Sequence, residues 1–168
     1  MGSNEVHHGI HRLFPRLWRY CLALAGNRDS AADLAQAACL KAIEKQEQFQ
    51  AGSELDRWLF RIAKNTWTNQ LRYDALRSQG SLDAIDTNDI ADLLQSDERH
   101  SAARDIVARV MGLPEAQRLS VLLVYVEGYS YKEAADILAI PVGTVMSRLA
   151  SARSKLQTDL SSYQRQLS

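Results

Sequence analysis

Apolar residues recur every three or four positions along most of the chain, while glycine and proline are scarce. This spacing lines apolar side chains along one face of a helix, so the sequence predicts an all-α protein. Helices are expected over residues 13–25, about 29–47, 54–77, 115–127, 130–138 and from 141 or 142 onward, with the apolar pattern of the second half restarting at Ile106.

Turn and cap residues set the expected ends of these helices. Gly26 and Asn27 signal the end of the first helix, and Asp29 or Ser30 is able to cap the second. Residues 120–126, Ser-Val-Leu-Leu-Val-Tyr-Val, have the composition of a buried strand. We predict helix there, because no partner strand exists elsewhere in the chain.

Two helices are expected to have distinct inner and outer faces. The third should bury Leu55, Trp58, Leu59 and Ile62 and expose Arg57, Arg61, Lys64 and Arg72. The last should bury Val142, Val145, Leu149, Ala152 and Leu156 and expose Thr144, Ser147, Arg148, Ser151, Ser154 and Lys155. Both outer faces are therefore polar and partly cationic.

The formal net charge of the 168 residues is zero, but the charges are unevenly placed. Residues 57–77 carry five basic side chains and one acid, and residues 142–168 carry four and one. Residues 81–99 carry six acids and one base. We therefore expect two small basic domains, 1–78 and 103–168, joined by a flexible acidic linker over 79–102, with or without a short helix.

Several function classes are disfavoured. There is no phosphate-binding glycine loop, no nucleophile beside a base and no cysteine-rich metal motif, so we expect neither an enzyme nor a cofactor or metal. His7 and His11 share a helix face, but with His8 they fit a solvated N-terminus better than a metal site. No signal peptide or membrane span is expected, and Cys21 and Cys39 fit buried free thiols in a reducing cytoplasm.

The segment from Ser130 onward predicts a helix-turn-helix: a short helix, a tight turn over 139–141 and an amphipathic helix with a polar outer face. In such motifs the second helix enters the DNA major groove, and basic residues beside it bind phosphates. The alternative is a helical hairpin whose outer face is merely solvated.

The amino-acid sequences of three regions resemble those of one family, the extracytoplasmic-function sigma factors of the sigma-70 family. Residues 113–118 (LPEAQR), 127–135 (EGYSYKEAA), 140–149 (IPVGTVMSRL) and 152–153 (AR) resemble the family's fourth conserved region. Residues 33–36 (DLAQ) resemble its core-polymerase-binding motif, and 49–53 followed by 58–65 (WLFRIAKN) resemble its −10 segment. The resemblance covers nearly the whole chain in the family's order.

The resemblance implies two sets of contacts for the first domain. Core RNA polymerase, at the clamp helices of its largest subunit, would be bound by Asp33, Leu34, Gln36 and Leu40. For the chain as a whole the resemblance also implies a contact with the flap of the second subunit. The melted −10 element would be bound by Phe49, Gln50, Gly52, Ser53, Arg61, Lys64, Asn65, Asn69, Arg72 and Arg77, with one flipped base entering the loop that follows Phe49.

For the second domain the resemblance implies binding of the −35 duplex. The residues concerned are Tyr131, Lys132, Thr144, Met146, Ser147, Arg148, Ser151, Arg153 and Lys155. An anti-sigma factor is an implied further partner. Residue by residue, other interpretations stay open: Phe49 as a core residue, Trp58 and Trp67 as packing residues, and Asp33 as an exposed helix charge.

The chain departs from the family pattern at two places. Ala37 and Ala38 stand where an acid commonly follows the glutamine, and Ala32 replaces another acid. On the groove-facing turn Met146, Ala150 and Ser151 stand where larger or basic residues are common, so we expect −35 reading through DNA shape and backbone contacts. These departures keep two alternatives open: a sigma mimic that titrates an anti-sigma factor, and a free-standing helix-turn-helix regulator that binds a palindrome as a dimer.

Overall fold

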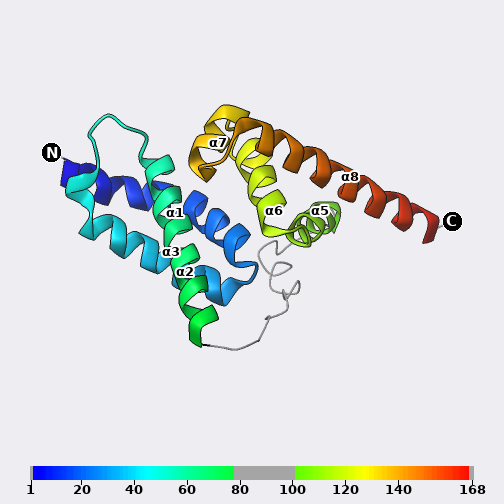
Figure 1. The fold of residues 1–168 in the computed structure, drawn as a ribbon, viewed down its shortest axis with the longest axis horizontal. Coiled ribbons are helices and arrows are strands. Elements are labelled where there is room, and N and C mark those ends of the chain that lie inside the picture. The colour runs from blue at the N-terminus through cyan, green and yellow to red at the C-terminus, as the bar shows by residue number, and fades with distance from the viewer. Residues whose placement is uncertain (1, 78–100, 167–168) are drawn as a thin grey trace. The chain divides into compact units, whose positions relative to one another are not determined.

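The computed structural model describes residues 2–77 and 101–166, and every element within those ranges is helical, which confirms the all-α class (Figure 1). The chain divides into two compact units, one within residues 1–84 and one within 85–168. Most of the expected acidic linker, and any short helix in it, lies outside the described residues.

The first unit consists of α1 (Gly2–Ala25), α2 (Arg28–Glu44), a short 3-10 turn η1 (Gln46–Gln48) and α3 (Leu55–Arg77). The three long helices pack against one another around a core that includes Leu17, Leu34 and Leu59. At its centre the rings of Tyr20 and Phe60 stack, with centroids 4.6 Å apart and planes inclined by 20°. This aromatic pair joins α1 to α3.

The first helix begins much earlier than the expected residue 13. Val6 and Ile10 are buried, so the apolar stripe of α1 extends back to Val6, and a solvated N-terminus describes the histidines but not these two apolar residues. Gly9 allows this packing, because a Cβ atom at that position would lie only 2.1 Å from Leu55 Cδ2. His7, His8 and His11 remain on the exposed side of the helix.

The second helix is capped one turn earlier than expected. Gly26 ends α1 with a φ of +79°, as its sequence signal indicated, and the side chain of Asn27 then accepts a hydrogen bond of 2.9 Å from the Ser30 backbone N–H. Asn27, and not Asp29 or Ser30, is the N-cap, because the left-handed glycine reverses the chain immediately before it. The helix ends at Glu44 and not near residue 47.

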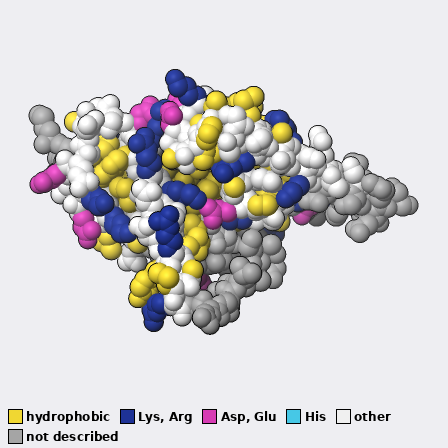
Figure 2. All heavy atoms as spheres, viewed as in Figure 1, with side chains coloured by type: hydrophobic (Ala, Val, Ile, Leu, Met, Phe, Trp, Pro, Cys, Tyr) yellow, Lys and Arg dark blue, Asp and Glu magenta, His cyan; other side chains and the backbone are white. Residues whose placement is uncertain are grey.

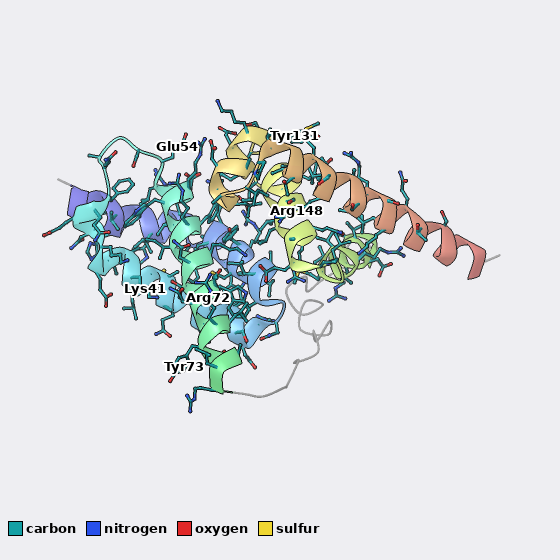
Figure 3. The ribbon with its side chains drawn as sticks, viewed as in Figure 1. Lys41, Glu54, Arg72, Tyr73, Tyr131 and Arg148 are labelled. Carbon is teal, nitrogen blue, oxygen red and sulfur yellow. The ribbon has the colours of Figure 1, made fainter. Side chains whose placement is uncertain are left out.

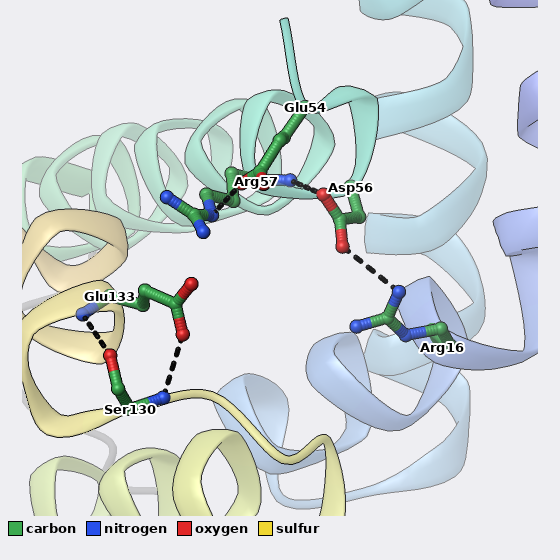
Figure 4. A network of polar contacts seen from close by, with 6 residues as sticks. All are labelled: Arg16, Glu54, Asp56, Arg57, Ser130 and Glu133. Carbon is green, nitrogen blue, oxygen red and sulfur yellow. Dashed lines mark hydrogen bonds and ion pairs between the residues drawn. The ribbon is translucent and has the colours of Figure 1, made fainter.

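Polar side chains fix α3 against its neighbours. Arg16 on α1 donates a 2.9 Å ion-paired hydrogen bond to Asp56 in the first turn of α3, and the guanidinium of Arg16 also lies 5.8 Å from the ring centroid of Phe60 (Figure 4). Lys41 on α2 donates to Thr66 Oγ1 at 3.3 Å. The start and middle of α3 are thereby held at two separate points.

The second unit consists of α5 (Ser101–Met111), α6 (Glu115–Val121), a π-helical turn η4 (Leu122–Val126), α7 (Tyr131–Leu138) and α8 (Val142–Gln166). Its core includes Leu113, Leu119, Leu123, Ile137 and Leu149. The strand-like segment 120–126 is helical, as predicted, but it widens into a π turn before Gly128 (φ +78°) ends it. Ile106, where the apolar pattern restarts, is 59% exposed.

No single helix in the described part of the chain combines the length and apolarity needed to span a bilayer. The α7 helix and residues 142–158 of α8 reach that length and apolarity only when they are taken together, and this pair is bent by 104°.

Arg118 is a buried cation in the second unit. It is 3% exposed, and its guanidinium donates hydrogen bonds of 3.1 Å to the backbone carbonyls of Met111 and Leu113. These carbonyls lie at the end of α5 and in the turn that follows, where a helix leaves its last acceptors without backbone donors. Burial lowers the pKa of Arg118, while the nearby charge of Glu115 raises it.

Replacing Arg118 with Met should destabilise the second unit by about 2–3 kcal/mol, because two buried carbonyls would lose a charged donor. Urea unfolding followed by far-UV circular dichroism measures both units, whereas tryptophan fluorescence measures only the first, which contains Trp18, Trp58 and Trp67. We expect the dichroism midpoint to fall and the fluorescence midpoint to stay. Lys132→Met, at an exposed position, is the control. Equal midpoints for Arg118→Met and wild type would contradict this role.

The two cysteines are free thiols, as expected, with Cys21 buried and Cys39 half-buried. Burial, and secondarily the proximity of Cys39, raises the pKa of Cys21 from 9.0 to about 12, and burial also raises the pKa of Cys39. Since the thiolate is the reactive form, both thiols should be poor nucleophiles at neutral pH.

Iodoacetamide at pH 8 should therefore modify Cys39 slowly and Cys21 hardly at all, as measured by peptide mass spectrometry. The urea-unfolded chain is the control, in which both should react at equal rates. Below pH 9.0 folded and unfolded chains both keep the Cys21 proton; above it the unfolded chain loses the proton first, so stability should fall as the pH rises toward 12. Rapid labelling of Cys21 in the folded chain would refute this picture.

Candidate nucleic-acid interface

The outer face of α3 carries a row of polar and cationic side chains. Arg61, Asn65, Asn69 and Arg72 are exposed and follow one another at helical spacing, while Lys64 beside them is half-buried. Along the face shown in Figure 2, dark blue basic side chains follow α3 from its first turns to its last, and Figure 3 labels Arg72 and Tyr73 on its final turns. Arg77, at the end, places its guanidinium 5.5 Å from the Tyr73 ring centroid.

A shallow pocket of about 430 Å³ lies where this row begins. Part of its wall is the loop before α3, which is closed by two hydrogen bonds to the Gln50 carbonyl, from Ser53 N at 3.0 Å and from Ser53 Oγ at 2.7 Å. Gly52 allows the turn, with a φ of +85°. The lining residues are Gln48, Gln50, Ser53, Glu54, Arg57, Trp58 and Arg61.

Phe49 does not offer its ring to this pocket. It is only 5% exposed and packs on Trp58, with ring centroids 5.2 Å apart and planes inclined by 53°. The ring of Phe49 is part of the core, which is the other interpretation that the sequence left open for this residue. Trp58 is half-buried and lines the pocket, so it is the aromatic surface available there.

The sequence alone assigned Trp58 to packing and did not indicate Gln48 and Arg57 as lining residues. Trp58 does pack, but its place in the first turn of α3 also puts one edge beside the preceding loop. The Arg57 guanidinium is paired with the Glu54 carboxylate. The backbone N–H of Arg57 donates a 2.8 Å hydrogen bond to Asp56 Oδ1 (Figure 4). The signal available in the sequence was the position of these residues at the two ends of the loop, with Gln48 before it and Arg57 after it.

The exposed face of α2 brings together three of the four residues expected to bind polymerase. Asp33, Gln36 and Leu40 are exposed and separated by three and four residues, and Leu40 is 55% exposed although it is apolar. Leu34 is 1% exposed and belongs to the core, so its expected role in binding is wrong. It lies on the opposite face of α2 and supports the exposed row from beneath.

In the second unit α7 and α8 form the predicted helix-turn-helix. The side chain of Ser130 accepts from Glu133 N at 3.2 Å, and Glu133 Oε2 accepts from Ser130 N at 2.8 Å, so a reciprocal capping box starts α7 (Figure 4). Ala139 ends it in the left-handed conformation with a φ of +54°. The Ile140 N–H donates to the Ala135 carbonyl at 3.1 Å, which closes the turn.

The last helix has the predicted two faces, except that Val142 is exposed and Leu156 is only half-buried. Val145, Leu149 and Ala152 are buried, whereas Val142 is 46% exposed and does not belong to the inner face. Val142 is the first residue of α8 and lies at the edge of the packed surface. Exposed candidates for DNA contact are Tyr131, Lys132, Met146, Ser147, Ser151, Arg153 and Lys155, and half-buried ones are Thr144 and Arg148.

Two details of α8 bear on its chemistry. Ser147 Oγ donates to the Thr144 carbonyl at 3.0 Å, which leaves its oxygen as an acceptor on the surface. Arg153 Nη1 donates to the hydroxyl of Tyr125 at 2.8 Å. Tyr125 was not among the residues that the sequence analysis singled out.

Together these surfaces present cations, amides and hydroxyls. No group of three or more His, Cys, Asp or Glu side chains suited to a metal occurs among the described residues. Exposed guanidinium and ammonium groups suit phosphates, and amide and hydroxyl groups suit base edges. The arrangement of these groups is therefore suited to binding a nucleic acid.

Comparison with known proteins gives the family. The "Sigma-70 region 2" family model matches residues 10–78, and the "Sigma-70, region 4" model matches residues 103–156. The ECF RNA polymerase sigma factor EcfG of Rhodopseudomonas palustris is 36% identical over 157 residues, which are 92% of this chain and 84% of that protein. The ECF RNA polymerase sigma-E factor of Escherichia coli is 36% identical over 135 residues, which are 72% of this chain and 69% of that protein.

Solved structures agree. The sigma factor RpoE of Bartonella quintana, determined in complex with the anti-sigma factor NepR, matches with a TM-score of 0.68 and 28% identity, over 94% of this chain and 97% of that one. CnrH, at 20% identity and a TM-score of 0.64, shares the fold. Sequence motifs, fold and relatives therefore agree that this chain belongs to the ECF RNA polymerase sigma factors of the sigma-70 family.

Proposed function

We propose that the chain acts as an ECF sigma factor through three surfaces: the exposed row of α2 binds core RNA polymerase, α3 with its pocket captures the melted −10 strand, and α7–α8 bind the −35 duplex. The corresponding domains would be residues 1–78 and 103–168, with 79–102 as their linker. The observation that carries the proposal is the pocket beside Trp58, which lies at the start of the cationic row of α3.

In the first unit the pocket would receive an unstacked base. Separating DNA strands costs on the order of 1–2 kcal/mol per base-pair step, and stacking one base on an aromatic side chain returns about 1–3 kcal/mol. Trp58 supplies that surface, and Gln50 and Ser53 in the pocket wall, with Asn65 on α3, supply hydrogen-bonding groups. Arg61, Lys64, Asn69, Arg72 and Arg77 would then follow the strand along α3. Melting would thus result from preferential binding of the single strand and needs no catalytic residue.

On α2 the polar and apolar row of Asp33, Gln36 and Leu40 is suited to pack on another helix. Leu40 would lose exposed apolar surface, and Asp33 would supply a charge partner. The alanines that replace family acids differ in burial, and their effects on the surface charge of α2 therefore differ. Ala38 is fully buried, so an acid could not lie there without a desolvation cost, whereas Ala37 is half-buried and is a true loss of surface charge.

In the second unit α8 would enter the major groove of the −35 element. Met146 and Ser151 are exposed but have little hydrogen-bonding reach, so base reading would depend on close fit and on DNA shape. Lys132, Arg148 and Lys155 would contribute phosphate contacts, with Thr144 and Ser147 near the start of the helix. An anti-sigma factor is a further proposed partner, because the similar RpoE protein was solved with one.

A run-off transcription assay with core RNA polymerase and promoter fragments tests the polymerase surface. We expect discrete transcripts with the wild-type chain and at least a tenfold loss with Asp33→Arg, because the charge reversal falls within the proposed row. Glu47→Arg reverses an exposed acid outside α2 and should leave transcription unchanged. If wild type yields no transcript and does not bind core polymerase, a sigma mimic becomes the better interpretation.

Replacing Trp58 with Leu tests the pocket, because leucine keeps apolar contact with Phe49 but loses most of the stacking surface. Loss of about 1–3 kcal/mol of stacking corresponds to a fall of roughly 5- to 100-fold in open complex. Permanganate reactivity of unpaired thymines in the −10 element measures the opening. A template already unpaired over that element should recover most of the lost signal, since melting is then no longer required.

Trp67→Leu is the matched control, because Trp67 is a half-buried tryptophan of the same helix and does not line the pocket. Equal defects in Trp58→Leu and Trp67→Leu would assign the effect to packing of α3 and would contradict the pocket's role.

A further inference from the structure

Tyr125, Tyr131 and Arg153 form a surface group in the second unit that we call the tyrosine–arginine cluster. They come from three elements: Tyr125 from η4, Tyr131 from the first residue of α7 and Arg153 from α8. The Arg153 guanidinium donates to Tyr125 Oη at 2.8 Å, and the Tyr131 hydroxyl is close enough to Arg153 to contribute to raising its pKa. All three residues are exposed.

The π turn is what presents Tyr125 at the surface. Glu127 N donates to the Leu122 carbonyl at 2.9 Å, five residues back, so the backbone is wider here than in an α-helix. Leu122 and Leu123 at its start are buried, whereas Tyr125 is 54% exposed. The contact that the structure shows for the Tyr125 hydroxyl is with Arg153. Turns of this kind are frequent at functional sites.

The hydrogen bonds within the cluster have a fixed direction. Arginine has donors only, so the Tyr125 oxygen must accept from Arg153, and its own O–H proton is then directed elsewhere. The same reasoning applies to Tyr131. Hydrogen bonding to Tyr125, followed by that to Tyr131, raises the pKa of Arg153, so the guanidinium stays charged. Among the described residues its partners are these hydroxyls and not a carboxylate.

A group that presents two hydroxyl protons and the remaining guanidinium N–H groups, with a positive charge, is suited to an anion with several acceptor oxygens. Its place in the fold identifies the anion. Arg153 follows Met146 by seven residues, or about two helical turns, so both lie along the same edge of α8. Tyr131 and Lys132 begin α7, the helix that crosses the DNA backbone in helix-turn-helix complexes. The anion is therefore a backbone phosphate of duplex DNA.

We propose that the tyrosine–arginine cluster is a preassembled site for one backbone phosphate of the −35 duplex, in which Tyr125 both positions Arg153 and donates its own hydroxyl proton. This inference rests on the proposed function, and it adds Tyr125, which the family resemblance did not indicate. Because Arg153 is already oriented in the free chain, less side-chain freedom is lost when DNA binds.

The test is Tyr125→Phe, which keeps the ring and removes the hydroxyl, in the full chain bound to core polymerase. Fluorescence anisotropy with a labelled promoter duplex gives the affinity at several salt concentrations. We expect binding about three- to tenfold weaker, as for loss of the net contribution of one typical exposed hydrogen bond. The slope of log K against log salt should become shallower by up to about one, because one phosphate contact loosens.

A double-mutant cycle separates positioning from general packing. In an Arg153→Ala background the further change Tyr125→Phe should weaken binding clearly less than it does in the wild-type background, because the residue that it positions is already absent and only the contact of its own hydroxyl remains to be lost. Tyr129→Phe, a half-buried tyrosine of the same segment, is the matched control and should bind as wild type does. An undiminished loss in the Arg153→Ala background would overturn the positioning role.

Neutral methylphosphonates placed singly along both −35 strands locate the phosphate. One position should weaken wild type severalfold and leave Tyr125→Phe nearly unchanged. Two results would contradict the phosphate site and leave the sigma function intact. In the first, wild type binds the promoter but every methylphosphonate position affects both proteins equally. In the second, Tyr125→Phe binds with wild-type affinity and salt slope. If the wild-type complex does not bind promoter DNA at all, the proposed function itself fails.

Discussion

The stacked pair of Tyr20 and Phe60 is the contact on which the geometry of the first unit depends. Both rings are buried, and they join the middle of α1 to the first turns of α3. Arg16 reinforces the junction because it pairs with Asp56 and lies over the Phe60 ring. With the start of α3 fixed in this way, the preceding loop must close over a short distance, and Trp58 is left with one edge on Phe49 and another on the pocket. The pocket is thus a consequence of how the core is packed.

In the second unit the corresponding role belongs to groups that satisfy backbone atoms at helix ends. Arg118 takes up two carbonyls at the end of α5 and in its turn, and Ser130 with Glu133 caps α7. Ala139 accepts a left-handed conformation, at a cost of roughly 1–2 kcal/mol for a residue other than glycine. A small unit with short helices has many such ends for its size, so its shape depends on polar side chains as much as on its core.

Helical periodicity was sufficient to predict the fold class, the helix-turn-helix and the polar outer faces of α3 and α8, because one apolar stripe per helix leaves little choice of orientation. The individual site residues were implied by the family resemblance. Periodicity could not predict what depends on neighbours in space. Asn27 caps α2 because Gly26 is left-handed, and α1 extends to Gly2 because Val6 and Ile10 find a partner surface. Phe49 and Trp58 exchanged their expected roles, since both are apolar enough for the core and only packing decides which edge is exposed. No fixed helical period could predict the exposed position of Tyr125, because a π turn shifts the register of the helix.

The groove-facing turn of α8 raises the question of how this chain would recognise a −35 element. Met146 and Ser151 offer methyl and hydroxyl groups where a bidentate base contact would need a longer polar side chain. Recognition of DNA shape can replace such contacts only if the protein is held in a defined register. The energy difference between deformable and stiff DNA affects binding only where the protein fixes the position of the DNA backbone. Phosphate contacts that are rigid before binding provide those points, whereas a freely rotating arginine would adapt to many backbones. A fixed Arg153 is therefore the complement that a weak groove face requires, and the two features belong to one strategy of recognition.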